Sequence, residues 1–589
     1  MEKVWWKEAV AYQVYPRSFY DSNGDGIGDL PGLTEKLDYI RDLGVDVLWL
    51  CPIFASPCRD DGNDISDHQK ILPELGTIED FYALLKKAHS YGMRVMLEMV
   101  IATTSEEHPW FQSARLSRRA LKRDFYIWRT PNWGDPPNNW KCYYGDSAWT
   151  YDEKTEQSFL HLFSKHRPEL NWENYKLRQE VYDAMLWWLD MGVDGVRIPS
   201  LQLLVKPDGL PDTVEIEDVP GWIRPQRQLE NQPDTHQHLR EMRRKLTRSY
   251  EVLMAGETKN VNVQQAREYA GETRGELDIV FQNEHLLVDC GPEGRYDLQS
   301  LELFKLKNIL SKWQMGMQED GWQALYFGGH DQPRMVSRFG DDSPEYRERS
   351  AKMLATILLT LKGTPFIYQG DEIGMTNCTF SEIEECRDLE SKAYYARQMR
   401  EEDAKPSRVM NVLSTRGRDS ARTPMQWGIS RSGGFTSADP WIKVNPNHVR
   451  LNVSLNENDD HSVLHYYRKA IVLRKQYKTL VYGKYVPLDD MNSQHYSYLR
   501  TDAEGTFLVL INFTRGRIFF TTPLVLRGKS VERVLSNYEK EDAKGDSERI
   551  QQYVSTLFHP DREQDDGRFF TLSGEIQLRP YEANVLKIR

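Results

Sequence analysis

Polar residues stand at the ends of several short β-branched or aromatic runs, where a barrel core would normally place branched apolar residues. The candidates are Asp64, Glu98, Arg197, Glu257 and the pair His330-Asp331. In a parallel barrel, functional side chains lie just past the carboxyl ends of the strands. Carboxylates, a histidine and an arginine that converge there can perform acid–base chemistry, although any one of them could equally be a satisfied ion pair at the rim.

A second group of oxygen-bearing residues occupies alternate positions shortly after the first run. Its possible ligands are Asp21, Asn23, Asp25, the carbonyl of Ile27 and Asp29, with Gly26 at the sharp turn. This spacing resembles a calcium loop, but the twelfth position is Gly32 rather than glutamate, so the loop is not an EF-hand. We predict Ca²⁺ or Mg²⁺ there, and the alternative is an Asx-rich turn without metal.

The elements that must position these residues alternate between strand-like and helix-like stretches, as in βα units around a parallel sheet. The expected strands are 9–15, 45–51, 94–101, 195–198, 252–255, 278–281, 324–327 and 365–368. Leucines and aromatic residues at helical spacing fill intervening segments such as 34–43 and 78–89. Eight such strands predict a (β/α)8 barrel, also called a TIM barrel.

Two segments depart from the barrel pattern. Residues 104–168 are rich in Trp, Asn and Pro and are too long for an ordinary βα loop, so we expect an inserted subdomain after the third strand. From about residue 484 the sequence is rich in β-forming residues, which predicts a C-terminal antiparallel β-sandwich. The expected division is barrel over 1–103 and 169–483, insertion over 104–168 and β-domain over 484–589.

Composition narrows the class of protein. The chain has 589 residues, a net charge of −12 and 39% hydrophobic residues, with a mean hydropathy of −0.66. No apolar run approaches the ~18 residues that a membrane span needs, and the start carries no secretory pattern. The net negative charge without basic blocks argues against nucleic acid and anionic membranes, and six scattered cysteines are typical of a reduced, cytoplasmic protein.

Long motifs in the chain resemble one known family. They are AVAYQVYPRSF at 9–19, DSNGDGIGD at 21–29, LNWEN at 170–174, HDQPR at 330–334 and RTPMQW at 422–427. The chain is similar, nearly end to end, to the α-glucosidases and oligo-1,6-glucosidases of the α-amylase superfamily. The resemblance implies a catalytic barrel with an insertion and a C-terminal β-domain, a structural Ca²⁺ or Mg²⁺ at the 21–29 loop, and no organic cofactor.

The resemblance also assigns roles. The family hydrolyses glycosides with retention, using a nucleophile and an acid/base roughly 5 Å apart. It implies that Glu257 is the acid/base and Asp331 the transition-state carboxylate, and that Asp64, Arg197, His330 and Arg418 bind substrate. The family nucleophile stands two residues after the strand-four arginine, and here GVDGVRIP at 192–199 ends in Pro199. Proline has no side-chain oxygen, so it cannot form a covalent intermediate.

Other departures surround the position of the cleaved glucose. Where the family has aspartate, asparagine and histidine on strand three, this chain has Glu98, Ala102 and Thr103, and Asn63 replaces a ring-stacking tyrosine. We therefore expect a degenerate α-glucosidase with lost or very weak hydrolysis that binds an α-glucoside as a sugar-binding or regulatory protein. Two alternatives stay open: an active α-glucosidase on maltose-type substrates, and a barrel repurposed for acid–base chemistry on a non-sugar molecule. A protein partner is not predicted.

Overall fold

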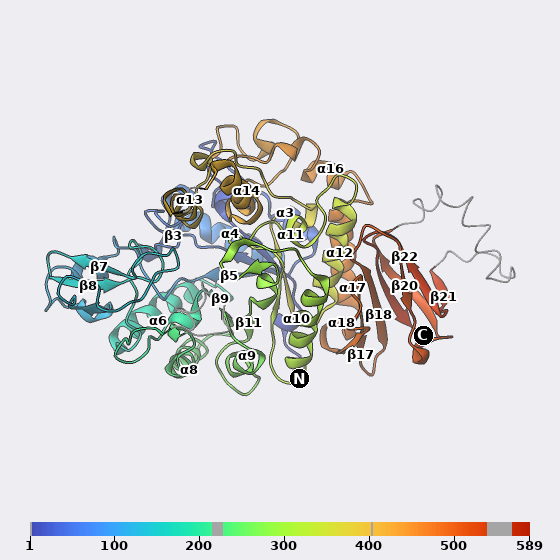
Figure 1. Cartoon of the computed structure of the whole chain (residues 1–589), viewed down its shortest axis with the longest axis horizontal. Coiled ribbons are helices and arrows are strands. Elements are labelled where there is room, and N and C mark those ends of the chain that lie inside the picture. Colours follow the sequence, from blue (N-terminus) through green and yellow to red (C-terminus); the bar gives the residue numbers. More distant parts are fainter. Residues whose placement is uncertain (1–2, 215–227, 402–403, 539–567) are drawn as a thin grey trace.

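A computed structural model describes residues 3–214, 228–401, 404–538 and 568–589 (Figure 1). The barrel occupies the centre, the insertion projects on one side and the C-terminal domain packs on the other (Figure 1). Within these residues, no helix combines the length and the apolar character needed to cross a membrane.

Eight parallel strands form the central barrel. They are β1 (Ala11–Val14), β2 (Val47–Leu50), β5 (Arg94–Glu98), β9 (Gly195–Ile198), β10 (Leu253–Glu257), β11 (Ile279–Phe281), β14 (Ala324–Leu325) and β15 (Thr364–Tyr368). Their order is β11-β10-β9-β5-β2-β1-β15-β14, and a parallel bridge between Val280 and Gln323 links the two ends of this sheet. The predicted (β/α)8 barrel is confirmed, and each of the eight expected strands is present.

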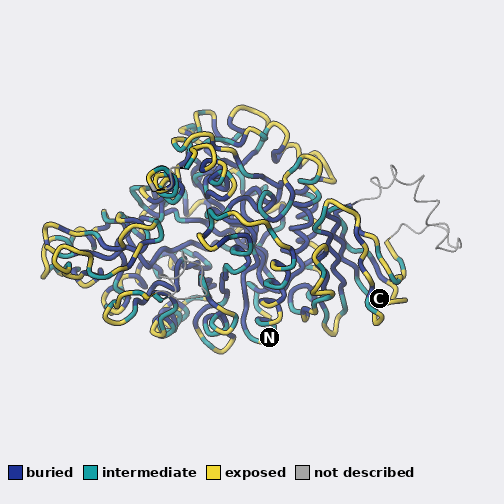
Figure 2. Tube along the Cα trace, viewed as in Figure 1, coloured by how far each residue is buried: buried dark blue, intermediate teal, exposed yellow. Residues whose placement is uncertain are grey.

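The strands are short and nearly fully buried, because helices cover the outside and side chains fill the inside. Aromatic rings contribute to the interior, where Phe281 packs against Phe366 with ring centroids 4.6 Å apart and against Trp49 at 5.5 Å. Buried residues trace this core in Figure 2, with exposed ones at the periphery. The barrel is therefore a packed core whose free space lies at its mouth.

Several helices begin at side-chain caps. Thr77 and Asp80 form a reciprocal capping box at the start of α4, and Asn262 and Gln265 form another at α9. The helices are α1 (Trp5–Glu8), α2 (Leu30–Glu35), α3 (Leu37–Leu43), α4 (Ile78–Ser90), α5 (Pro109–Ala114), α6 (Tyr175–Asp190), α8 (Asp234–Leu246), α9 (Val263–Ala270), α10 (Leu303–Gly316), α11 (Met335–Phe339), α12 (Arg347–Thr360), α13 (Leu389–Glu401), α14 (Pro406–Arg416), α15 (Asp419–Arg422), α16 (Val453–Glu457), α17 (Val463–Gln476) and α18 (Thr479–Tyr482).

The insertion contains a small antiparallel sheet. Its strands β6 (Trp128–Arg129), β7 (Trp149–Asp152) and β8 (Gln157–Leu160) run in the order β6-β8-β7. Trp140 and Trp149 pack in a cluster that also includes Leu203 from the segment after β9. The tryptophan-rich segment thus supplies a core that holds the insertion against the barrel. Trp133 is an exception and is exposed.

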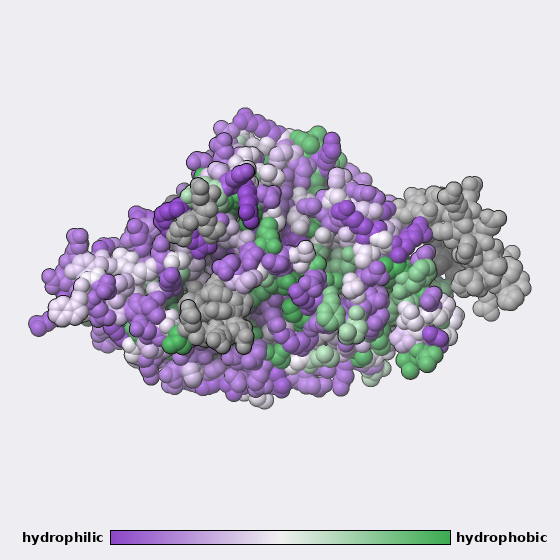
Figure 3. Space-filling model, viewed as in Figure 1, coloured by the Kyte–Doolittle hydropathy of each residue, from purple (hydrophilic) through white to green (hydrophobic). Residues whose placement is uncertain are grey.

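The C-terminal domain is a β-sandwich of a six-stranded and a two-stranded sheet. The strands are β16 (Lys484–Leu488), β17 (His495–Thr501), β18 (Thr506–Asn512), β19 (Ile518–Thr521), β20 (Ser530–Ser536), β21 (Phe569–Thr571), β22 (Glu575–Leu578) and β23 (Ala583–Ile588). Leu508, Phe520 and Leu578 belong to the core between its sheets. In Figure 3 the hydrophobic surface gathers toward this domain, whereas hydrophilic residues dominate the insertion.

Short strands outside these sheets shape the barrel mouth. They are β3 (Phe54–Ala55), β4 (Asp67–Ile71), β12 (Cys290–Gly291) and β13 (Gly294–Leu298). β3 and β4 flank the loop that carries Asn63 and Asp64, and β12 and β13 form a hairpin beside the segment of His330.

Candidate active site

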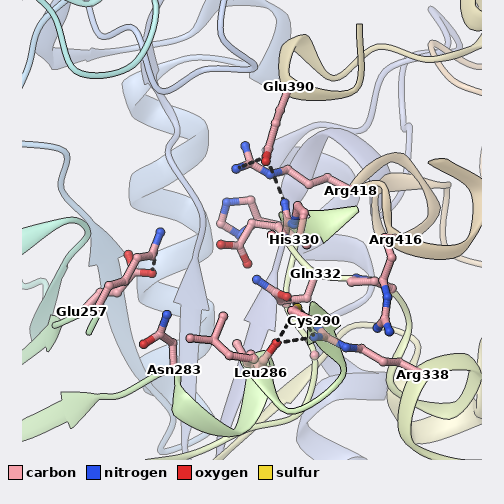
Figure 4. Close-up of a pocket in the computed structure, with 18 of the residues that line it drawn as sticks. Glu257, Asn283, Leu286, Cys290, His330, Gln332, Arg338, Glu390, Arg416 and Arg418 are labelled. Atoms are coloured by element: carbon pink, nitrogen blue, oxygen red, sulfur yellow. Dashed lines mark hydrogen bonds and ion pairs between the residues drawn. The ribbon is translucent and has the colours of Figure 1, made fainter. Parts of the chain in front are cut away.

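Residues from different strands meet in a cavity at the carboxyl end of the barrel. An inner recess of about 60 Å³ is lined by Glu98, Arg197 and Pro199, and it shares Glu257, His330 and Asp331 with a wider outer cavity of about 220 Å³. Figure 4 shows Glu257 facing the side of the pocket that carries His330. The expected convergence of polar residues beyond the strands is thus present in the structure.

Arg197 connects two of the carboxylates. Its Nη1 lies 2.9 Å from Oε1 of Glu98, and its Nη2 lies 3.1 Å from Oε2 of Glu257. On the other side of Glu257, Nζ of Lys259 lies 3.3 Å from Oε1. The guanidinium is only 6% exposed, so its two anionic partners are needed to offset the cost of burying its charge.

The two glutamates have opposite pKa shifts. Burial would raise the pKa of Glu257, but Lys259 and Arg197 outweigh it and hold this pKa below the ordinary value. Burial raises the pKa of Glu98 to about 7, even though Arg197 opposes the rise. A general acid at neutral pH needs a raised pKa. Glu257 is therefore held as a carboxylate, while Glu98 can keep a proton near neutrality.

His330 and Asp331 follow β14. Burial lowers the pKa of His330 to about 3, so the imidazole is neutral at pH 7. Burial would raise the pKa of Asp331, but nearby cationic groups, including Lys259 and Arg418, hold it well below its usual range. Nη2 of Arg295 also donates to the backbone carbonyl of Asp331 at 2.9 Å, which fixes this turn. Asp331 is thus a permanent anion at the pocket wall.

Pro199 lies in the inner recess directly after β9, partly exposed and without a polar side-chain atom. The next residue, Ser200, has a φ of 51°, in the left-handed region. Its backbone N–H donates to Oε2 of Glu257 at 3.2 Å. The chain after β9 thus contributes a backbone donor to the pocket, but no carboxylate at Pro199.

A buried ion pair fills the wall opposite Glu257. Nη1 of Arg167 lies 2.7 Å from Oδ2 of Asp60, and its Nη2 donates to Oγ1 of Thr103 at 3.2 Å. The Arg167 guanidinium also covers the ring of Phe163 at 4.3 Å. Arg167 and Asp60 are 7% and 3% exposed. A cation therefore stands beside Thr103, the position for which the resemblance implies a sugar-binding histidine.

Arg418 and Asp64, the two remaining predicted substrate-binding residues, differ in their position relative to the pocket. Arg418 lines both parts of the pocket, and its Nη2 lies 2.7 Å from Oε2 of Glu390 (Figure 4). Asp64 is fully buried and does not line either part of the pocket; its carboxylate accepts hydrogen bonds from Ser56, Arg59 and Asp60 within its own loop. Asp64 therefore stabilises its own loop.

Some residues that line the pocket are not among those predicted from the sequence. Lys259 stands two residues after Glu257, so local spacing could have suggested it. Arg167 meets Asp60 across more than a hundred residues, and only the folded chain brings them together. Aromatic rings of Trp49, Tyr143, Tyr144, Phe281, Tyr326 and Tyr394 line the outer cavity.

The predicted metal loop is a network of turns. Asp21 accepts hydrogen bonds from the backbone of Asn23, Gly24 and Gly26, and Asp29 accepts from Ser22 and caps α2 through Gly32. Asn23 and Asp25 accept from the next residue but one. Within the described part of the chain, no trio of His, Cys, Asp or Glu ligand atoms within 4.8 Å includes a residue of this loop. The three carboxylates of the loop therefore do not converge within that distance, and the cation stays a prediction.

Comparison with known proteins agrees with this architecture. The model of the α-amylase catalytic domain matches residues 13–483. The chain is 45% identical, over all 589 residues and the whole relative, to a protein of Parageobacillus thermoglucosidasius named oligo-1,6-glucosidase. It is 46% identical to a protein of that name from Halalkalibacterium halodurans, covering 95% of this chain and 99% of the relative. The crystal structure of isomaltulose synthase from Klebsiella sp. LX3 superposes with a TM-score of 0.91 at 36% identity, covering all of both chains. The chain therefore belongs to the α-amylase family.

Proposed function

We propose that this protein binds α-glucosides in the barrel pocket and that its retaining hydrolysis is lost or very weak. The proposal rests on Pro199, which lines the recess two residues after Arg197, where the family resemblance calls for the nucleophile. A retaining mechanism needs a second carboxyl group about 5 Å from the acid. Loss of a nucleophile costs on the order of 10⁴–10⁶ in rate in hydrolases of known mechanism.

The electrostatics of Glu257 support the same proposal. A retaining acid/base must hold a proton for the leaving group in the first step. The Lys259 ammonium and the Arg197 guanidinium instead keep the pKa of Glu257 below its ordinary value, against the effect of burial. The carboxylate can accept a hydrogen bond from a sugar hydroxyl, but it is a poor proton donor at pH 7.

The rest of the pocket favours a sugar ligand. Asp331 and Glu257 are hydroxyl acceptors, Arg418 and the neutral His330 are donors, and Tyr143 and Tyr144 add aromatic surface. This mixture of fixed polar groups and aromatic walls is typical of small-molecule sites. The roles of these residues, with Arg197, are part of the proposal.

An active α-glucosidase on maltose-type substrates is the second candidate. The names of the relatives, oligo-1,6-glucosidase at 45–46% identity over nearly the full length, favour this candidate over a degenerate one. Without a nucleophile it would need an inverting route, with a base about 6.5–9.5 Å from the acid and a water between them. Asp331 is the available carboxylate for that base.

Calorimetry and product analysis on the full chain separate the candidates. Maltose, isomaltose and acarbose are titrated, and glucose release from the first two is measured in the same samples. We expect heat of binding without turnover, and binding that weakens at least tenfold in Asp331→Asn but not in the exposed control Asp342→Asn. Turnover above about 1 s⁻¹ that Glu257→Gln abolishes would establish the second candidate instead. No binding to any of these sugars would overturn both and favour a non-sugar ligand.

A further inference from the structure

Three side chains with metal-ligating atoms meet beneath the pocket. Cys51 follows β2, Glu98 ends β5 and His330 follows β14, and they are 0%, 2% and 9% exposed. One ligand atom of each lies within 4.8 Å of the other two. The barrel thus gathers a sulfur, a nitrogen and an oxygen from three segments that are distant in the sequence.

The separations suit a tetrahedral centre. Sγ of Cys51 lies 3.4 Å from Nδ1 of His330. With Zn–S near 2.3 Å and Zn–N near 2.0 Å, two ligands at a tetrahedral angle stand about 3.5 Å apart. The sulfur and nitrogen are therefore already spaced as two ligands of one ion.

Glu98 adds a second observation at this cluster. Its Oε1 pairs with Arg197, while its buried Oε2 makes no hydrogen bond within ordinary geometric limits and has only the Trp49 indole N–H nearby as a donor that lowers the pKa of this carboxyl. An unpaired buried carboxylate oxygen carries a desolvation penalty that native structures normally offset. A cation between Glu98, Cys51 and His330 would supply that missing partner.

Gln13 completes the surroundings. Its side-chain nitrogen lies 3.0 Å from Nδ1 of His330 and 3.3 Å from Sγ of Cys51. As a donor, this amide directs its N–H to the Nδ1 lone pair, so an ion bound at Nδ1 would take the place of that hydrogen bond. The two ends of an amide are assigned from the hydrogen-bond network, and a rotated Gln13 would present its oxygen to an ion.

We propose that Cys51, Glu98 and His330 bind a thiophilic divalent cation, Zn²⁺ foremost, at the floor of the pocket. Sulfur, imidazole and carboxylate together suit Zn²⁺, whereas Ca²⁺ and Mg²⁺ take oxygen ligands. A thiolate and a carboxylate neutralise the ion, and binding releases the thiol proton. The site is separate from the 21–29 loop, and it does not depend on the proposed sugar binding.

Metal uptake by the full chain tests this inference. The protein is stripped with a chelator, titrated with Zn²⁺ by competition against a chromophoric chelator, and then loaded with Co²⁺ for absorption spectroscopy. We expect one zinc per chain and a thiolate-to-cobalt charge-transfer band in the near ultraviolet.

Two variants locate the ion. Cys51→Ser should lose the charge-transfer band and weaken zinc binding by at least ~100-fold, the upper end of effects from outer-shell changes. The matched control Cys58→Ser changes a thiol outside the cluster and should bind as the parent does. Glu98→Asp, which withdraws the oxygen by one methylene, should weaken binding and retain the band.

Absence of uptake by the parent protein, or a Co²⁺ spectrum without a thiolate band, would overturn the metal site. Equal zinc affinity in Cys51→Ser and the parent would do the same. If Cys51→Ser fails to fold, the parent spectrum together with Glu98→Asp decides. Because sugar binding is measured separately by calorimetry, failure here leaves the proposed function untouched, and the reverse also holds.

Discussion

The two sides of the pocket mouth differ in the polar groups that they present. On the side of β10 and β14, Glu257, His330 and Asp331 carry the groups that the family resemblance calls for, with cations packed around them. On the side of β5 and β9, Pro199 and Arg167 line the pocket, and the buried Thr103 and Asp60 bind Arg167 from behind.

The comparison shows that the neighbours of Glu257 influence its acidity as strongly as its residue type does. The pKa of an acid is set by its neighbours as much as by its type. With no carboxylate at Pro199, the charges nearest to Glu257 are those of Arg197 and Lys259, and both favour its ionised form. The pKa of Glu257 in this pocket thus reflects two nearby cations.

The largest expected effect comes from restoring the altered side as a unit. Pro199→Asp combined with Asn63→Tyr, Ala102→Asn and Thr103→His should raise glucose release from p-nitrophenyl α-glucoside on the order of 10⁴-fold over the parent, because catalytic groups act together. Pro199→Asp alone should give only a small part of this gain, because the contacts that orient the substrate are still absent.

The control for this experiment is the same combined variant with Glu257→Gln, which should return to the parent rate. Near-complete activity from Pro199→Asp alone would mean that the nucleophile was the only loss of consequence. The difference between the two sides would then reduce to a single residue.

The second prediction concerns the buried Arg167–Asp60 ion pair beside the pocket. Arg167→Gln leaves the Asp60 carboxylate buried without its cation, and breaking such a pair typically costs about 3–5 kcal/mol. The matched control is Arg59→Gln. Arg59 forms ion pairs with Glu106 and Glu107 near the surface, and each such pair is typically worth about 0–1 kcal/mol. The thermal midpoint of unfolding measures both. Equal shifts would show that the Arg167–Asp60 pair does not stabilise this wall.

The smallest expected effect tests the 21–29 loop, whose acidic residues match the family motif. If Ca²⁺ or Mg²⁺ binds the native state there, a concentration 100 times Kd adds about 2.7 kcal/mol of stability. EDTA should lower the melting temperature, Ca²⁺ should restore it, and Asp21→Ala should remove the response while Asp342→Asn retains it. Identical melting curves for metal-free and calcium-supplemented protein would leave an Asx-rich turn.

Much of the architecture could be predicted from local pattern. All eight barrel strands were expected from runs of β-branched and aromatic residues, because strands buried on both faces leave a continuous apolar signature. The β-rich text after residue 484 likewise predicted the C-terminal sandwich. The expected positions of Glu98, Glu257 and His330-Asp331 followed from the rule that strand ends meet at one rim, and the fold places them in one pocket.

Other features of the pocket could not be predicted in this way. Asp64 was expected to bind substrate, yet it lies outside the pocket lining and organises its own loop. Its backbone conformation, rather than its residue type, directs the carboxylate inward to neighbouring N–H groups. The downward pKa shift of Glu257 also depends on the distance to Lys259 and Arg197, which residue types alone do not specify.

The sequence by itself determined the barrel, its insertion, its C-terminal domain and the absence of a carboxylate at residue 199, because these depend on local periodicity and on residue chemistry. Only the tertiary structure decided which charges neighbour Glu257, that Arg167 stands beside Thr103, and that Cys51, Glu98 and His330 meet. Cys51 and His330 are 279 residues apart in the chain. Their proximity arises from barrel closure, and the electrostatic and ligand interactions of a site depend on distances in the folded chain, which separation along the sequence does not fix.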